Sequence, residues 1–140
     1  MTGLAQHRPS EPAAGADPLL RISELTVEFR TRAGAIRAND KVSLDIRPGE
    51  TLGVVGESGS GKSVLCRAIL RLLPSPPAKV SAKSLLFAGR DLMGLDDAAM
   101  RNVRGHDIAM IFQNPMTSLN PVWPIGDQVA EPLRLHRGMG

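Results

Sequence analysis

The chain has 140 residues, which sets one ordinary domain as its upper limit. Hydrophobic residues make up 42% and charged residues 22%, values close to those of soluble globular proteins, so wholly disordered, collagen-like and coiled-coil classes are excluded. The net charge of +3 is spread along the chain without a basic block, and aromatic residues make up 3%, so the composition does not suggest nucleic-acid binding.

The single cysteine, Cys66, cannot form an intramolecular disulfide, which fits a reducing compartment. We interpret it as a small core residue. No apolar run approaches the length that a membrane-spanning helix needs, and the first twenty residues lack the apolar core of a secretory signal. These features predict a cytoplasmic chain.

The first expected elements are a disordered leader and two antiparallel strands. Residues 1–18 are rich in Pro, Ala and Gly and contain few large apolar side chains. Apolar and polar residues then alternate over 25–30 and again over 42–47, with a polar turn at 33–34 between them. This two-residue period predicts a pair of half-buried strands.

A strand, a loop and a helix are expected next. After a turn at 48–50, residues 51–55 form a short, mostly apolar run that is typical of a strand buried on both faces of a parallel sheet. A glycine-rich loop follows, and from Leu65 apolar residues recur at helical spacing until Pro74. The order strand, loop, helix is the context that a phosphate-binding motif requires.

The downstream segments predict two further strands and two further helices. The expected elements are a strand over 84–88 closed by Gly89, a short helix over 97–103 capped by Asp96, a second buried strand over 108–112, and a helix over 125–136 that contains Pro132.

The glycine-rich loop, residues 56–63, reads Gly-Glu-Ser-Gly-Ser-Gly-Lys-Ser and matches the pattern Gly, four residues, Gly-Lys-Ser/Thr. Its glycines let successive backbone N–H groups converge on one point, and the following helix adds the positive end of its dipole. The Lys62 ammonium can contact the outer phosphates, and the Ser63 hydroxyl can coordinate Mg²⁺. A glycine-rich turn without a ligand is the alternative, but four fixed positions rarely coincide by chance. The predicted phosphate-binding residues are Gly56, Glu57, Ser58, Gly59, Ser60, Gly61, Lys62 and Ser63.

Three stretches carry a more specific pattern: residues 49–63, residues 104–121 with the string Phe-Gln-Asn-Pro-Met-Thr-Ser-Leu-Asn-Pro, and residues 125–128. In these stretches the sequence resembles the ATP-binding subunits of ABC transporters, and among them the oligopeptide, dipeptide and nickel importer group. The resemblance runs from about Leu20 to the last residue. It implies an α/β fold, a P-loop NTPase core with an N-terminal antiparallel β subdomain, over residues 19–140.

The resemblance also implies roles for three further residues. Gln113 falls on the Q-loop glutamine, which in the family touches the magnesium ion or the attacking water and senses the membrane subunit; a glutamine that merely caps a strand end is the alternative. Phe29 matches the aromatic residue that stacks on adenine, although it also completes an apolar alternation and fits a core position. Val64 stands where many members carry Ser or Thr, which leaves only its backbone N–H for the inner phosphate.

Partners and cofactors follow from the same resemblance. Met116 and Trp123 lie where the family docks a coupling helix of the transmembrane subunit, with core packing as the alternative. The family implies ATP and Mg²⁺, transmembrane permease subunits, a second ATP-binding subunit in a homo- or heterodimer, and indirectly an extracytoplasmic substrate-binding protein. It places such a chain peripherally on the cytoplasmic face of the inner membrane.

Three motifs of the family do not occur after Gln113: the Leu-Ser-Gly-Gly-Gln signature, an apolar strand ending in Asp-Glu, and a switch histidine. We therefore expect a domain truncated before its helical subdomain is complete, and we do not expect it to hydrolyse ATP alone. Three functions remain: an ATP-binding subunit that powers import of di- or oligopeptides, a non-catalytic nucleotide-binding fragment, or another P-loop enzyme such as a small kinase. The cargo, whether dipeptide, oligopeptide or nickel, stays open.

Overall fold

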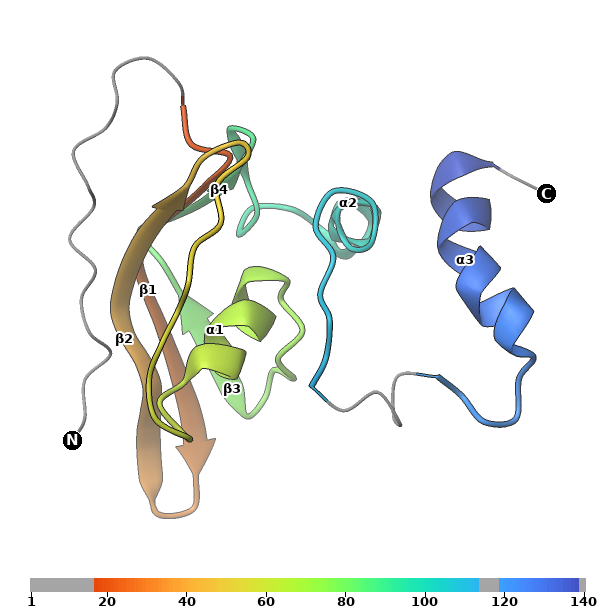
Figure 1. The fold of residues 1–140 in the computed structure, drawn as a ribbon. Helices are drawn as coiled ribbons and strands as arrows, with labels where there is room; N and C mark the ends of the chain where they lie inside the picture. Colours follow the sequence, from red (N-terminus) through yellow and green to blue (C-terminus); the bar gives the residue numbers. More distant parts are fainter. Residues whose placement is uncertain (1–16, 114–118, 139–140) are drawn as a thin grey trace. The chain divides into compact units, whose positions relative to one another are not determined.

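The computed structural model describes residues 17–113 and 119–138. These residues fall into two units that divide after Leu95, and each unit is described by itself (Figure 1). Residues 1–16 of the expected leader lie outside the described residues, as does Met116, so the predictions for them stay predictions.

The first unit is built on an antiparallel sheet around one long strand (Figure 1). Its strands are β1 (Leu20–Thr31), β2 (Gly34–Ile46), β3 (Ala78–Ser81), β4 (Ser84–Phe87) and β5 (Arg90–Asp91). β1 pairs with β2 along one edge and with β3 and β4 along the other, and β5 pairs with β4. The alternations therefore predicted strands that lie in β1 and β2, and the strand expected over 84–88 is β4. β3 was not predicted, because the prolines before it indicated only the end of a helix.

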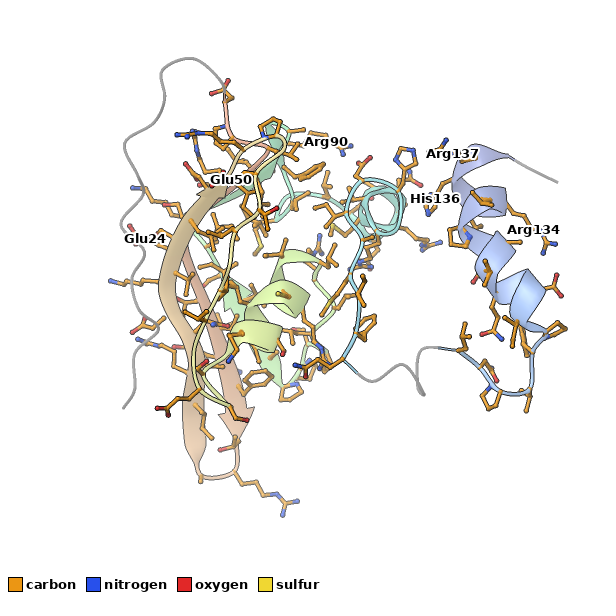
Figure 2. All side chains as sticks on the ribbon, viewed as in Figure 1. Glu24, Glu50, Arg90, Arg134, His136 and Arg137 are labelled. Atoms are coloured by element: carbon orange, nitrogen blue, oxygen red, sulfur yellow. The ribbon has the colours of Figure 1, made fainter. Side chains whose placement is uncertain are left out.

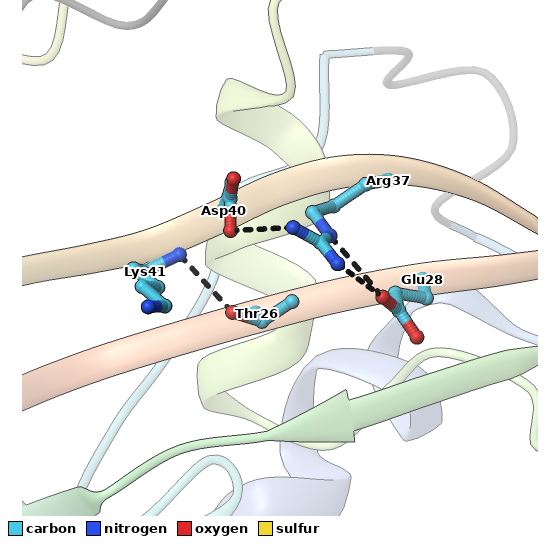
Figure 3. A network of polar contacts seen from close by, with 5 residues as sticks. All are labelled: Thr26, Glu28, Arg37, Asp40 and Lys41. Atoms are coloured by element: carbon cyan, nitrogen blue, oxygen red, sulfur yellow. Dashed lines mark hydrogen bonds and ion pairs between the residues drawn. The ribbon is translucent and has the colours of Figure 1, made fainter.

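Three register shifts interrupt the β1–β2 pair, and the first two, between Ile22 and Leu25 and between Leu25 and Val27, decide which side chains face the core around Glu24 and Lys41. Glu24 and Lys41 adopt left-handed backbone conformations, with φ of 51° and 50°. At these two shifts a hydroxyl from the opposite strand accepts the backbone N–H: Ser43 Oγ from Glu24 at 2.9 Å, and Thr26 Oγ1 from Lys41 at 3.1 Å (Figure 3). Such a bulge inserts one residue, so the inward face of the strand shifts by one position beyond it.

Exposed charged side chains also join the two strands (Figure 3). The Arg37 guanidinium lies 3.0 Å from Glu28 Oε1 across the ladder and 3.1 Å from Asp40 Oδ1 on its own strand. Hydrogen bonds to Glu28, which has the larger effect, and to Asp40 raise the pKa of Arg37 above its usual value. Because the Arg37 side chain is exposed, its ion pairs add little to the stability of the fold. Their main effect is to favour this pairing of β1 with β2.

Helix α1 (Lys62–Ile69) contacts β1 and β2 and buries Leu65 and Ala68. It begins where the sequence predicted, directly after the glycine-rich loop. It ends earlier than Pro74, because Arg71 takes a left-handed φ of 51° and its guanidinium donates to the carbonyl oxygens of Leu92 and Leu95. The helix is therefore about one turn shorter than the apolar spacing indicated.

Cys66 is exposed, so its interpretation as a core residue was wrong. The cause is the helical period: with Leu65 and Ala68 turned toward the sheet, the residue after Leu65 is rotated by about 100° away from it.

Two predicted buried strands, residues 51–55 and 108–112, are not strands in the structure. Val55 is 78% exposed and Ile111 is 97% exposed. A strand forms only where a neighbour completes its ladder of hydrogen bonds. Within the described residues no segment pairs with 51–55, and the pairing at 108–112 is an isolated parallel bridge between Arg104 and Ile108. The part of the predicted α/β core that consists of parallel strands is thus absent from the described residues.

The second unit contains α2 (Asp97–Val103) and α3 (Ile125–Arg137), both at the predicted positions. The α3 helix contains Pro132, carries three basic residues in its last turn (Figure 2) and ends at Gly138 in a left-handed conformation. Basic side chains there are favourable because the carboxyl end of a helix carries partial negative charge. Across residues 17–113 and 119–138, no helix is both long and apolar enough to cross a membrane.

The cap of α2 yields a direct stability prediction. Asp96 Oδ1 accepts a hydrogen bond from the backbone N–H of Ala99 at 2.7 Å, as the sequence indicated. We expect Asp96→Ala to lower the free energy of unfolding of this unit by about 1 kcal/mol, measured by urea denaturation followed by circular dichroism. Asp96→Asn keeps an acceptor oxygen and is expected to stay close to wild type; equal losses in both variants would contradict the capping role.

Candidate phosphate-binding loop

Residues 56–61 of the predicted phosphate-binding set form a largely exposed loop between residues 51–55 and α1 (Figure 1), and Lys62 and Ser63 are the first two residues of α1. Gly59 and Gly61 take left-handed φ of 81° and 92°, and the Ser60 N–H donates to the Glu57 carbonyl at 3.2 Å, which closes a tight turn. Gly61 is the N-cap of α1 and has no side chain with which to cap the helix. The N–H groups of the first helical turn are therefore left for an external acceptor, the arrangement that binds anions at helix N-termini.

The Lys62 ammonium lies over the same loop. Its Nζ donates to the carbonyl oxygens of Gly56 at 2.6 Å and Glu57 at 2.7 Å, and to Ser60 Oγ at 3.2 Å. These three acceptors match the three N–H bonds of an ammonium group. A phosphate oxygen replacing one carbonyl would form a stronger, charge-assisted hydrogen bond. The loop thus gathers a positive charge and uncapped backbone donors around one place.

The start of α1 is packed tightly against β2. An added Cβ on Gly61 would collide with the carbonyl oxygen of Ala38, and would lie 2.8 Å from Asn39 Nδ2. Asn39 Nδ2 in turn donates to the Gly61 carbonyl at 3.3 Å. By contrast, a Cβ on Gly59 would meet nothing within 4 Å. Only one of the two left-handed glycines is therefore required by close packing as well as by backbone conformation.

Asn39 is the residue that sequence reasoning missed. It is 1% exposed, and it is the one buried polar side chain recorded for residues 17–113 and 119–138. A strict alternation from Val42 back along the strand would place residues 40 and 38 inside. The irregularity at Lys41 shifts the inward position to 39, opposite Val27. A local two-residue period cannot reveal a bulge, which is why this residue went unnoticed.

Phe29 lies on β1, in register with Ile36 of β2 on one side and Ala78 of β3 on the other. It is half-buried. This burial is compatible with packing in the core and also with contact between the ring and a ligand. Its role in adenine stacking stays a prediction. Val64 is half-buried in the first turn of α1, and its predicted contact with the inner phosphate also stays a prediction.

Gln113 belongs to the second unit and is exposed. Its predicted catalytic and metal-binding roles stay predictions. Trp123, also in the second unit, is 62% exposed, so the alternative of core packing is not supported for it. In the same unit, His106 Nδ1 lies 2.7 Å from Asp107 Oδ1, and the rings of His106 and His136 are 5.6 Å apart.

The loop and the start of α1 offer donors to an anion and one exposed hydroxyl oxygen, that of Ser63. Residues 17–113 and 119–138 include no cluster of three or more His, Cys, Asp or Glu side chains suited to a metal. Mg²⁺ is commonly bound through one or two protein oxygens together with phosphate oxygens and water. The exposed Ser63 hydroxyl at the start of α1 provides an oxygen of this kind beside the phosphate-binding donors.

Comparisons with known proteins identify the family of the chain. The family model described as ABC transporter matches residues 39–131. The chain is 52% identical over 126 residues to a putative peptide import ATP-binding protein of Brucella ovis, and 48% identical over 118 residues to an oligopeptide transport ATP-binding protein of Bacillus subtilis. These alignments cover 86% and 84% of the chain.

The chain spans about a third of the length of these relatives, 37% of the Brucella protein and 33% of the Bacillus protein. A peptidoglycan transport ATP-binding protein of Agrobacterium fabrum is 49% identical over 122 residues, which are 87% of the chain and 22% of that relative. The family match alone covers well over half of the sequence and includes the whole phosphate-binding loop. The chain therefore belongs to the ABC transporter family.

Proposed function

We propose that this chain is the ATP-binding part of a subunit that powers import of di- and oligopeptides across the inner membrane. The observation that carries the proposal is the convergence of the Lys62 ammonium and the uncapped start of α1 on one exposed loop. The names of the relatives, which refer to peptide import and oligopeptide transport, support the choice of cargo.

In this proposal the loop holds the phosphates of ATP. The backbone N–H groups at the start of α1 donate to phosphate oxygens, and Lys62 exchanges a loop carbonyl for an outer phosphate oxygen. Ser63 and Gln113 are the proposed oxygen ligands of Mg²⁺, which when bound would neutralise phosphate charge. Phe29 offers its half-exposed ring to the adenine, and Val64 its backbone N–H to the inner phosphate.

The proposed partners follow from the family. They are transmembrane permease subunits, a second ATP-binding subunit of the same or a related kind, and, indirectly, an extracytoplasmic substrate-binding protein. The proposed location is the cytoplasmic face of the inner membrane. Exposed Trp123 and the residues around Gln113 are the proposed contact with the permease, since aromatic side chains are enriched in such interfaces.

The two alternatives to this function make different predictions. A non-catalytic fragment would bind Mg-ATP without supporting transport, and a small kinase would transfer phosphate to an acceptor. The kinase has less support, because the relatives reported above carry transport names.

Uptake of labelled di- and tripeptides by the source cells tests the function. Disruption of the gene is expected to abolish a component of the uptake, and expression of the wild-type gene product is expected to restore it, whereas the Lys62→Ala form is not. The intact mass of the native product, measured after capture from the same cells, reports whether transport uses the 140-residue chain or a longer one. Unchanged uptake after disruption would contradict the proposed function.

A stacking role for Phe29 predicts a difference between ligands. Phe29→Ala is expected to weaken ATP binding by about five- to tenfold while leaving pyrophosphate binding within about twofold, because only ATP carries a base to stack. Isothermal titration calorimetry measures both affinities. Ile36→Ala, at the exposed cross-strand neighbour, is the matched control. Equal losses for ATP and pyrophosphate after Phe29→Ala would assign Phe29 to the core instead.

A further inference from the structure

Asn39 is a buried polar side chain that makes one hydrogen bond through Nδ2 and leaves Oδ1 without a partner. It is 1% exposed, and its Oδ1 has no hydrogen-bond partner, so a polar atom is buried without compensation. Its Nδ2 donates to the carbonyl oxygen of Gly61 at 3.3 Å. An apolar β-branched side chain would suit a buried strand position better. We therefore expect asparagine to make the chain less stable than an apolar residue at this position would, and its presence calls for an explanation outside the packing of the sheet.

The Gly61 carbonyl is the last peptide oxygen before α1, and it accepts two hydrogen bonds. One comes from the backbone N–H of Leu65 at 2.9 Å and begins the helix; the other comes from Asn39. A carbonyl oxygen only accepts, so it selects the amide nitrogen of Asn39 and turns Oδ1 away. The unpartnered Oδ1 is thus a consequence of the contact that Nδ2 makes.

The direction of this carbonyl fixes a donor at the phosphate-binding loop. The peptide bond between Gly61 and Lys62 is trans and planar, so its N–H points opposite to its C=O. With the Gly61 oxygen held toward β2, the Lys62 N–H points away from Asn39 and out of the amino end of α1. That N–H is among the donors an anion meets at the start of a helix.

We propose that Asn39 is a positioning residue for phosphate binding: it holds the Gly61–Lys62 peptide in the orientation that presents the Lys62 N–H, at a cost in stability. The inference rests on the proposed function, since it concerns the same phosphate site. It predicts that stability and affinity change in opposite directions when Asn39 becomes apolar, a combination that a purely structural role does not produce.

Asn39→Val is the first test, with thermal unfolding and calorimetric titration of ATP and pyrophosphate on the full chain. The midpoint of unfolding is expected to rise by roughly 4 °C or more, because the unpaired buried oxygen is removed. The affinities for ATP and for pyrophosphate are expected to fall by the same factor, about three- to tenfold. Leu85→Ala, at a fully buried position on β4, is the control: it is expected to lower the midpoint without changing either affinity below that temperature.

Asn39→Asp provides a second test that does not depend on how well valine packs. The introduced carboxylate cannot donate to the Gly61 oxygen, but its protonated form can, and burial raises the pKa of such a group. The ratio of wild-type to Asn39→Asp affinity is therefore expected to be large near pH 8 and to fall toward one as the pH is lowered. A ratio independent of pH would overturn the inference.

The remaining results of the titrations and of thermal unfolding would distinguish a failure of the positioning role of Asn39 from a failure of the proposed function. If wild-type chain binds ATP and Asn39→Val binds both ligands within twofold of it, the positioning role is overturned and the function stands. If Asn39→Val lowers both the midpoint of unfolding and the affinities for the two ligands, the role of Asn39 is structural only. Loss of ATP binding with unchanged pyrophosphate binding would indicate a nucleoside contact instead. If the wild-type chain binds neither ligand, the proposed function fails and the inference with it.

Discussion

Lys62→Ala is expected to lower the affinity of the chain for Mg-ATP by at least about a hundredfold. The substitution removes the ammonium that lies over the loop, and with it the proposed charge-assisted hydrogen bonds to the outer phosphates. The fold is expected to persist, because the carbonyl groups that lose the ammonium belong to Gly56 and Glu57, both of which are exposed and accessible to water. Calorimetric titration and far-ultraviolet circular dichroism measure the two effects separately.

Lys79→Ala is the matched control for this prediction. Lys79 is an exposed lysine on β3, so its loss makes the same change in net charge without touching the loop. It is expected to change ATP affinity by less than about twofold at physiological salt, since exposed charges are screened over about 8 Å. Retained affinity in Lys62→Ala, or an equal loss in both variants, would refute the phosphate-binding role of the loop.

The sequence predicted the elements whose signals are local. The Asp96 cap, the alternations in β1 and β2 and the short strand β4 depend on residues within a few positions of each other, and the structure has all of them. The glycine-rich loop followed by a helix is also a local signal, and the structure has this loop directly before α1, whereas its binding of phosphate stays a prediction.

The failures concern features that depend on partners distant in the sequence. Residues 51–55 have the composition of a buried strand, but composition does not supply the adjacent strands that would complete its hydrogen bonds. Asn39 became buried through a bulge at Lys41, which no two-residue period encodes. The end of α1 was set by Arg71, whose side chain reaches carbonyl groups more than twenty residues away.

Gly61→Ala is expected to lower the free energy of unfolding by about 3 kcal/mol and to abolish Mg-ATP binding. Two costs add: a left-handed conformation for a residue with a Cβ, and a collision of that Cβ with the backbone of β2. Gly59→Ala incurs the first cost without the second, since its Cβ would lie in open space, and is expected to lose only about 1 kcal/mol. Urea denaturation of the two variants therefore isolates the contribution of packing.

A second substitution tests which atom the added Cβ at Gly61 meets. The closest obstacle is the main-chain oxygen of Ala38, so Ala38→Gly is expected not to restore Gly61→Ala, because glycine retains that oxygen. At Gly56 the obstacle is a side chain: an added Cβ would lie 2.7 Å from Ser60 Oγ. Ser60→Gly is therefore expected to recover most of the stability lost in Gly56→Ala. Rescue of Gly61→Ala by Ala38→Gly would mean that the helix start can shift away from β2, and that the close packing of Gly61 does not fix the phosphate-binding loop.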